Sequence, residues 1–120
     1  MNFEQLRTYL LEKNGAVEER PFGPDTLVYK VGGKMFALIG IDNDPLRINL
    51  KCDPNEALFL RDIYPNAILP GYHMNKRHWN TVVLDGTLPQ AEFLRMVEDS
   101  YQLVVSSLPK AVQKKLANDA

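Results

Sequence analysis

The side chains best suited to binding chemistry are concentrated in the segment from residue 73 to residue 86. Two histidines, a lysine, an arginine, two asparagines and the only tryptophan stand there, next to an apolar run. Lysine and arginine hold phosphates, and an exposed histidine or tryptophan stacks on a base or wedges into a groove. The segment predicts a binding edge whose contact residues are His73, Lys76, Arg77, His78 and Trp79.

The tryptophan and the two cations of this segment also have structural interpretations. Trp79 can anchor the sheet to the last helix, provided that its indole N–H finds one partner, and we favour this role. For Lys76 and Arg77, a solvated turn and a contact to a ligand are equal alternatives.

A second group of polar side chains lies in segment 46–52, where apolar and polar residues alternate. The alternation places Arg47, Asn49 and Lys51 on one face of a strand. If helices cover the opposite face, Arg47 and Lys51 join Lys76 and Arg77 in one cationic surface that suits an anionic partner. The alternative is an exposed sheet face that its charges keep soluble.

Two further lysines flank a predicted hairpin turn. Lys30 and Lys34 stand on either side of Gly32-Gly33, where they can grip a nucleic-acid backbone. Lysines at hairpin ends also protect strand edges against aggregation, which is the alternative interpretation.

No arrangement of residues in the sequence predicts catalysis. His73 and His78 are five residues apart, which is not the i, i+4 spacing of a zinc-protease helix. Cys52 falls on the apolar side of its strand, which predicts a buried and inert thiol rather than a nucleophile. No glycine-rich phosphate loop leads into a helix. We therefore predict no enzymatic activity, no metal and no cofactor.

Composition limits the partners and the compartment. The 120 residues fit one domain, 1–120, with 14 basic and 15 acidic side chains and a net charge of −1. Binding to nucleic acid therefore requires a local basic patch. A single cysteine favours a reducing compartment, and no apolar run approaches the roughly 20 residues that span a bilayer. We expect a cytoplasmic protein without a membrane partner, and we favour a monomer.

Helical periodicity predicts three helices that position these residues. They cover residues 2–14, capped by Asn2, residues 53–63, and residues 89–108. The polar tail from about residue 110 can form a short helix that frays. The second helix should bury Ala57, Leu58 and Leu60.

Strand patterns fill the intervals between the helices. Residues 16–25 read as a connector, and Gly32-Gly33 joins two strands as a hairpin. The predicted strands cover residues 26–31, 34–41, 46–52, 67–69 with a resumption near Tyr72, and 79–84. This order predicts an α+β fold, with an antiparallel sheet and helices packed on one face.

The sequence resembles the MmcQ/YjbR family over essentially its whole length. The resemblance is carried by Pro21-Phe22-Gly23, Tyr29-Lys30-Val31, Gly33 to Ala37, Leu46 to Cys52, His73 to Val82, Asp85-Gly86 and Ser100-Tyr101. It implies an α-β(3)-α-β(2)-α order, similar in topology to type III secretion chaperones. It also implies a DNA-binding protein with a double-wing motif, in which two β-hairpins act as wings.

Two hypotheses for function follow. The first is DNA binding, with wings around Gly32-Gly33 and around Pro70 to His78. Its contact set is Lys30, Lys34, Arg47, Lys51, His73, Lys76, Arg77, His78 and Trp79. The second is a non-enzymatic adaptor of chaperone-like topology that binds a protein or a small ligand.

Overall fold

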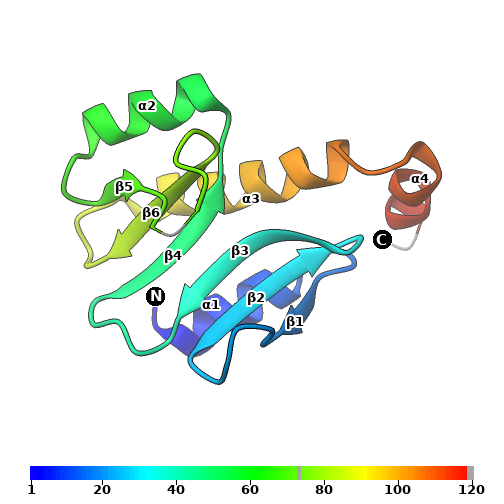
Figure 1. Ribbon diagram of the computed structural model, residues 1–120, viewed down its shortest axis with the longest axis horizontal. Helices are drawn as coiled ribbons and strands as arrows, with labels where there is room; N and C mark the ends of the chain where they lie inside the picture. The colour runs from blue at the N-terminus through cyan, green and yellow to red at the C-terminus, as the bar shows by residue number, and fades with distance from the viewer. Residues whose placement is uncertain (73, 119–120) are drawn as a thin grey trace.

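Six strands form one antiparallel sheet in the order β1-β2-β3-β4-β6-β5 (Figure 1). A computed structural model describes residues 1–72 and 74–118. The strands are β1 Val17–Glu19, β2 Thr26–Val31, β3 Lys34–Gly40, β4 Leu46–Lys51, β5 Ile68–Pro70 and β6 Trp79–Leu84. The helices are α1 Phe3–Leu11, α2 Pro54–Ile63, α3 Gln90–Ser106 and α4 Lys110–Asn118. The predicted α+β class and antiparallel sheet are confirmed.

The β2–β3 hairpin forms where the sequence places it. Gly32 and Gly33 have φ values of 58° and 82°. Two positive φ angles in succession match the two-residue turn that follows the twist of the strands. In the resulting register, Val31 pairs with Lys34 and Leu27 pairs with Ile39.

Helix α1 begins at the predicted cap. The Asn2 side chain accepts a hydrogen bond from the Gln5 amide, and the Gln5 side chain accepts one from the Asn2 amide. This reciprocal pair satisfies two of the amides that a helix start leaves unpaired. Leu6 and Leu10 are the residues of α1 that are fully buried.

Helix α3 is fastened across the middle of the sheet. The Ser100 hydroxyl donates to the Phe36 carbonyl oxygen (2.6 Å) and accepts from the Lys51 amide (2.9 Å). One buried hydroxyl therefore ties α3 to both β3 and β4. The Tyr101 ring packs edge-on against Phe36, with 5.4 Å between ring centroids. Apolar residues of α1, α2, α3 and the sheet form one core on this side.

Four details differ from the sequence predictions. Residues 17–19 form an edge strand inside the predicted connector, because their backbone pairs with β2 although the segment is too short for a pattern. Strand β5 ends at Pro70 and does not resume at Tyr72. The polar tail forms a helix of nine residues, α4. The chain thus runs helix, four strands, helix, two strands, two helices.

The fourth difference is in α2. Leu58 is 62% exposed, whereas Ala57 and Leu60 are buried. Helix α2 lies at the end of the sheet and buries a single narrow stripe, so a residue one position from that stripe faces outward. No described helix is both long and apolar enough to cross a membrane.

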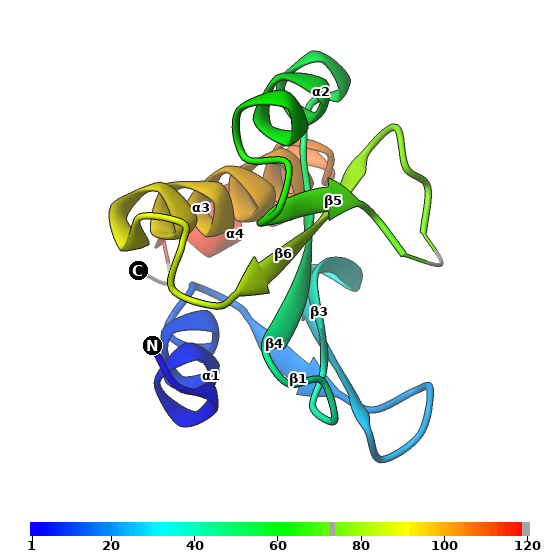
Figure 2. The same cartoon turned by 90° about the vertical axis from the view of Figure 1, so that its left-hand side faces the viewer.

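The sheet has one face covered by helices and one open face. Ile48, Leu50 and Val82 belong to the core on the helical side, so the alternate residues of β4 and β6 point the other way. In Figure 2, α1, α3 and α4 lie to the left of the sheet and α2 lies above it, while two connections project to the right. These connections join β1 to β2 and β5 to β6, and they flank the open face.

Candidate ligand-binding face of the sheet

The open face carries a cavity of about 670 Å³. Residues of β3, β4 and β6 form its floor, and the two flanking connections form its walls. Of the described residues that line it, Arg47 is the only one with a charged side chain, and no carboxylate is among them. The cavity therefore combines one cation with a mainly neutral lining.

Apolar side chains form much of the lining. Met35 and Leu38 come from β3, and Met74 comes from the β5–β6 connection. Phe22 and Tyr72 stand on opposite connections and are 68% and 69% exposed. The exposed surface of these two rings adds to the apolar part of the lining.

A chain of hydrogen bonds orients the polar floor. The Tyr72 amide donates to the Thr81 hydroxyl oxygen (3.1 Å), and the Thr81 hydroxyl donates to Asn49 Oδ1. Thr81 and Asn49 face each other across β6 and β4, and they are 3% and 9% exposed. Because Oδ1 is engaged, the amide nitrogen Nδ2 of Asn49 is turned to the cavity. No acceptor in the described part of the chain is bonded to it.

Asn49 therefore differs from the expectation that the whole polar stripe lies open. Its neighbour Thr81 and the connection that Tyr72 anchors cover it, so its donors are presented in a partly dry site. Asn75 adds a similar group. Its Oδ1 accepts from the Arg77 amide (3.0 Å), and its side-chain nitrogen has no described acceptor.

The predicted cations divide into a group without ion pairs and a group held by neighbouring side chains. Arg47, Lys51, Lys76 and Arg77 form no ion pair with any carboxylate of the described residues. Arg47 is exposed and lines the cavity. Lys51 pairs with Trp79 at the other end of β4, and the Cys52 amide donates to the His78 carbonyl oxygen (2.8 Å). Lys51 and segment 76–79 therefore meet at one end of the sheet.

The second group is Lys30 and Lys34, whose side chains contact neighbouring residues. Lys30 forms an ion pair with Glu19 (2.9 Å), and Lys34 Nζ lies 3.3 Å from the Ser107 hydroxyl. The turn between them packs on the chain that links α3 to α4, since a Cβ on Gly32 would lie 2.6 Å from Leu108 Cδ1. The structure thus sets this hairpin end apart from the other predicted contact residues.

The remaining predicted contacts lie in the β5–β6 connection. His78 and Trp79 are partly buried. In β6, Asn80 bonds to α2 and Val82 joins the core, so Trp79 points to the open face and not toward the last helix. This alternation does not favour an anchor to the last helix, and the structural role of Trp79 stays a prediction. His73 lies outside the described residues.

Arg61 positions this connection and was not identified from the sequence. Its guanidinium donates to Asn80 Oδ1 (2.7 Å) and to the carbonyl oxygens of Lys76 and Trp79. A basic residue in the last turn of α2 carries no sequence signal that distinguishes it from an ordinary surface arginine. Phe22, Met35, Leu38, Tyr72 and Met74 were missed for a related reason, because only the folded sheet brings them together.

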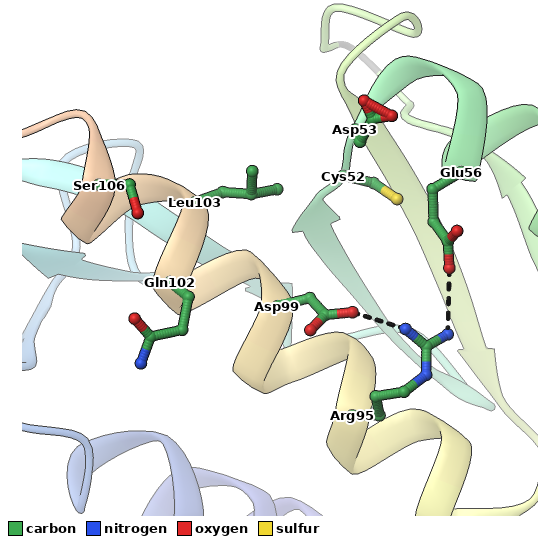
Figure 3. A pocket seen from close by; sticks show the side chains of 8 residues that line it. All are labelled: Cys52, Asp53, Glu56, Arg95, Asp99, Gln102, Leu103 and Ser106. Carbon is green, nitrogen blue, oxygen red and sulfur yellow. Dashed lines mark hydrogen bonds and ion pairs between the residues drawn. The ribbon is translucent and has the colours of Figure 1, made fainter.

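A second hollow lies on the helical side between α2 and α3 (Figure 3). Arg95 lines this hollow and pairs with Glu56 (3.3 Å), Asp99 (2.6 Å) and Glu92. This network ties α2 to α3, and it leaves the guanidinium fully engaged. It is best described as a structural contact.

Cys52 lines the same hollow and is half-buried, not fully buried as expected. Burial, together with the nearby Glu56 and Asp53 carboxylates, raises the pKa of its thiol to about 11. The thiol is protonated at neutral pH and is therefore a poor nucleophile. Among the described residues, no group of three or more His, Cys, Asp or Glu side chains is placed to hold a metal ion.

Comparison with known proteins gives a consistent family. The family model described as YjbR matches residues 11–103. Protein YbdF of Escherichia coli O157:H7 is 44% identical over 96 residues, which cover 80% of this chain and 78% of that one. Protein YjbR of Escherichia coli strain K12 is 34% identical over 117 residues, which cover 97% and 98% of the two chains.

Solved structures agree with these sequence relatives. Protein DR2400 of Deinococcus radiodurans superimposes with a TM-score of 0.90 at 43% identity, covering 95% of this chain and 86% of that one. A Pseudomonas syringae protein superimposes with a TM-score of 0.71 at 33% identity, covering 87% and 99%. The chain belongs to the YjbR family.

Proposed function

We propose that this YjbR-family protein is a non-enzymatic binding protein that takes a small anionic ligand in the cavity on its open sheet face. The observation that carries the proposal is the lining of that cavity, where Arg47 is the only charged side chain among the described residues. The Arg47 guanidinium attracts an anion, and no described residue of the lining carries a carboxylate that would compete for it.

The size and composition of the cavity support a ligand of low molecular mass. Its volume of about 670 Å³ falls within the range of roughly 300–1,000 Å³ that is usual for such sites. Those sites are also mainly apolar, with a few polar groups that fix the orientation of the ligand. Met35, Leu38 and Met74 supply the apolar part here.

The polar groups of the cavity are mostly donors. Arg47 offers N–H groups in a planar fork, and the hydrogen bond from Thr81 leaves the Asn49 amide nitrogen as a second donor. Carboxylates and phosphates carry only acceptor oxygens, and their hydrogen bonds to a guanidinium are among the stronger ones in proteins. The donors therefore favour an oxyanion over a cation or an apolar molecule.

A pair of arginine variants tests this proposal. The probes are 4-hydroxybenzoate and uridine 5′-monophosphate, and affinity is measured by titrating the amide resonances of the labelled protein. Arg47→Met should weaken binding by about tenfold or more, because it removes a charged hydrogen-bond donor. Arg77→Met is the matched control, since it removes the same charge from an exposed residue that does not line the cavity. Equal affinities in both variants would contradict the proposal.

DNA binding is the second candidate, and one observation favours it. Lys51, Lys76 and Arg77 meet at one end of the sheet beside Trp79 and have no described carboxylate partner. Cations of this kind hold phosphates, and an aromatic side chain beside them can stack on a base. With a net charge of −1, binding would depend entirely on this local group.

The salt dependence of binding distinguishes this candidate. Fluorescence anisotropy of labelled single-stranded and duplex DNA should show affinity that falls steeply with salt. Removing Lys76 and Arg77 by substitution with Met should lower the logarithmic slope by about one for each lost phosphate contact. Lys114→Met, on α4, is the control. If neither DNA form binds in a salt-sensitive way at low ionic strength, this candidate is wrong.

A further inference from the structure

We infer, on the basis of the proposed binding function, that the ligand is a planar aromatic compound with a single carboxylate or phosphate. The lining of the open-face cavity separates into an apolar part that suits a flat ring and a donor part that suits one anionic group.

The apolar part is built to contact a ring on its edges and faces. Phe22 and Tyr72 come from connections at opposite sides of the sheet, over the β1–β2 and β5–β6 ends of the strand order (Figure 2). Met35 and Met74 line the same cavity. Aromatic rings favour stacked or edge-on neighbours, and methionine sulfur makes favourable contacts with ring edges. A flat ring satisfies both kinds of side chain.

The donor part of the lining limits the number of anionic groups on the ligand. One guanidinium can form one bidentate pair with a carboxylate or a phosphate. A ligand with several anionic groups would leave the others without a cation, because Arg47 is the only charged residue among those described in the lining. The cavity therefore selects a single anionic group.

The spacing of donors along β4 adds a second requirement. Arg47 and Asn49 are two residues apart on the same face, which places them about 7 Å from each other along the strand. The Asn49 side-chain nitrogen, whose amide oxygen accepts from Thr81, is therefore a second donor on the same strand face as Arg47. A ring carbonyl or hydroxyl oxygen of the ligand can accept from it.

Matched probes separate the contributions of ring and charge. 4-Hydroxybenzoate carries both, cyclohexanecarboxylate lacks the flat ring together with its hydroxyl, and 4-hydroxybenzamide lacks the charge. Uridine 5′-monophosphate carries a planar base and a phosphate, so its binding tests whether the site takes a phosphate as well as a carboxylate. We expect the probes with both features to bind about tenfold tighter than either of the two that lack one.

Variants test whether the named side chains create these preferences. Phe22→Ala and Tyr72→Ala should reduce the preference for 4-hydroxybenzoate over cyclohexanecarboxylate, and Arg47→Met should remove the preference over 4-hydroxybenzamide. Phe59→Ala is the control, because Phe59 is an aromatic of α2 that is 59% exposed and does not line the cavity. Thermal unfolding of each variant checks that the fold is retained.

The outcomes separate this inference from the function on which it rests. If the probes bind at the open face with equal affinity whatever their ring or charge, the inference is overturned and the binding function stands. If no probe shifts amide resonances of the open face at millimolar concentration, the binding function is overturned together with it.

Discussion

Glu18 is a charged residue whose carboxylate is used in contacts that stabilise the fold. Its carboxylate accepts from Arg7 Nε (2.8 Å) on α1 and from the Tyr29 hydroxyl (2.8 Å) on β2. The Arg7 hydrogen bond, followed by the bond from Tyr29, lowers the pKa of Glu18 below its ordinary value of 4.5. The three residues fasten α1 to the edge of the sheet.

A pH dependence of stability follows at this residue. A carboxylate with a depressed folded-state pKa stabilises the protein above its unfolded pKa, and this contribution is lost as the pH falls through the folded pKa. The free energy of unfolding in urea should therefore decrease as the pH falls below the ordinary pKa of 4.5, and Glu18→Gln should flatten that decrease. The same substitution at exposed Glu12 should leave it unchanged. Equal acid slopes in wild type and Glu18→Gln would contradict this assignment.

Thr81 is the residue on which the polar floor of the cavity depends. Its hydroxyl links the Tyr72 amide in the β5–β6 connection to Asn49 in β4. The hydroxyl thereby fixes the position of the whole β5–β6 connection relative to the sheet.

Thr81→Val tests that link, since it keeps the shape and removes the hydroxyl. The substitution leaves the Tyr72 amide and the buried Asn49 oxygen without this partner, at a cost of about 1–3 kcal/mol. Hydrogen exchange should accelerate at the Tyr72 amide. The Gly71 amide, bonded to the Trp79 carbonyl oxygen (2.9 Å), is the internal reference. Unchanged exchange at Tyr72 would show that Thr81 does not hold the connection.

The β2–β3 turn offers a second test at the level of elements. Gly32 and Gly33 both have positive φ, but a Cβ would contact Leu108 only at Gly32, and nothing lies within 4 Å at Gly33. Alanine should cost about 1–2 kcal/mol at either position from backbone strain. Gly32→Ala should cost more because Leu108 must also move, and the difference is read from urea unfolding. If Gly33→Ala proved equally or more costly, the packing of this turn on Leu108 would be unimportant.

The elements differ in how far local sequence determines them. The β2–β3 hairpin, β4, β6, α2 and α3 follow from turn glycines, alternation and helical periodicity, which act within a few residues. Strand β1 does not, because three residues carry no measurable period and its pairing depends on β2. Leu58 was expected in the core because its apolar side chain does not reveal that α2 lies at the end of the sheet.

In the candidate site, too, local sequence determines some features and the completed fold determines others. The polar stripe of Arg47 and Asn49 can be predicted from alternation alone, and so can its position opposite the apolar face. The cover over Asn49 cannot, because it depends on where the β5–β6 connection returns. Phe22 and Tyr72 are fifty residues apart in the chain, and only the completed sheet makes them walls of one cavity.

Paired and unpaired charges are distributed unequally between the helical face and the open face of the sheet. The net charge is −1, so the field near each surface depends on local arrangement. On the helical side, Arg7, Lys13 and Arg95 are paired with Glu18, Glu98 and the carboxylates around α2 and α3. Arg47 on the open face has no such partner among the described residues. We therefore expect an anion to bind at the open face.

The most direct test of this account locates a bound anion in solution. Intermolecular nuclear Overhauser effects can be recorded between the ring protons of 4-hydroxybenzoate and the labelled methyl groups of methionine and leucine. We predict contacts to Met35, Leu38 and Met74, which line the cavity, and their loss in Arg47→Met. Contacts confined to Leu58 on α2, or contacts that persist unchanged in Arg47→Met, would contradict the claim that the open face binds the ligand through Arg47.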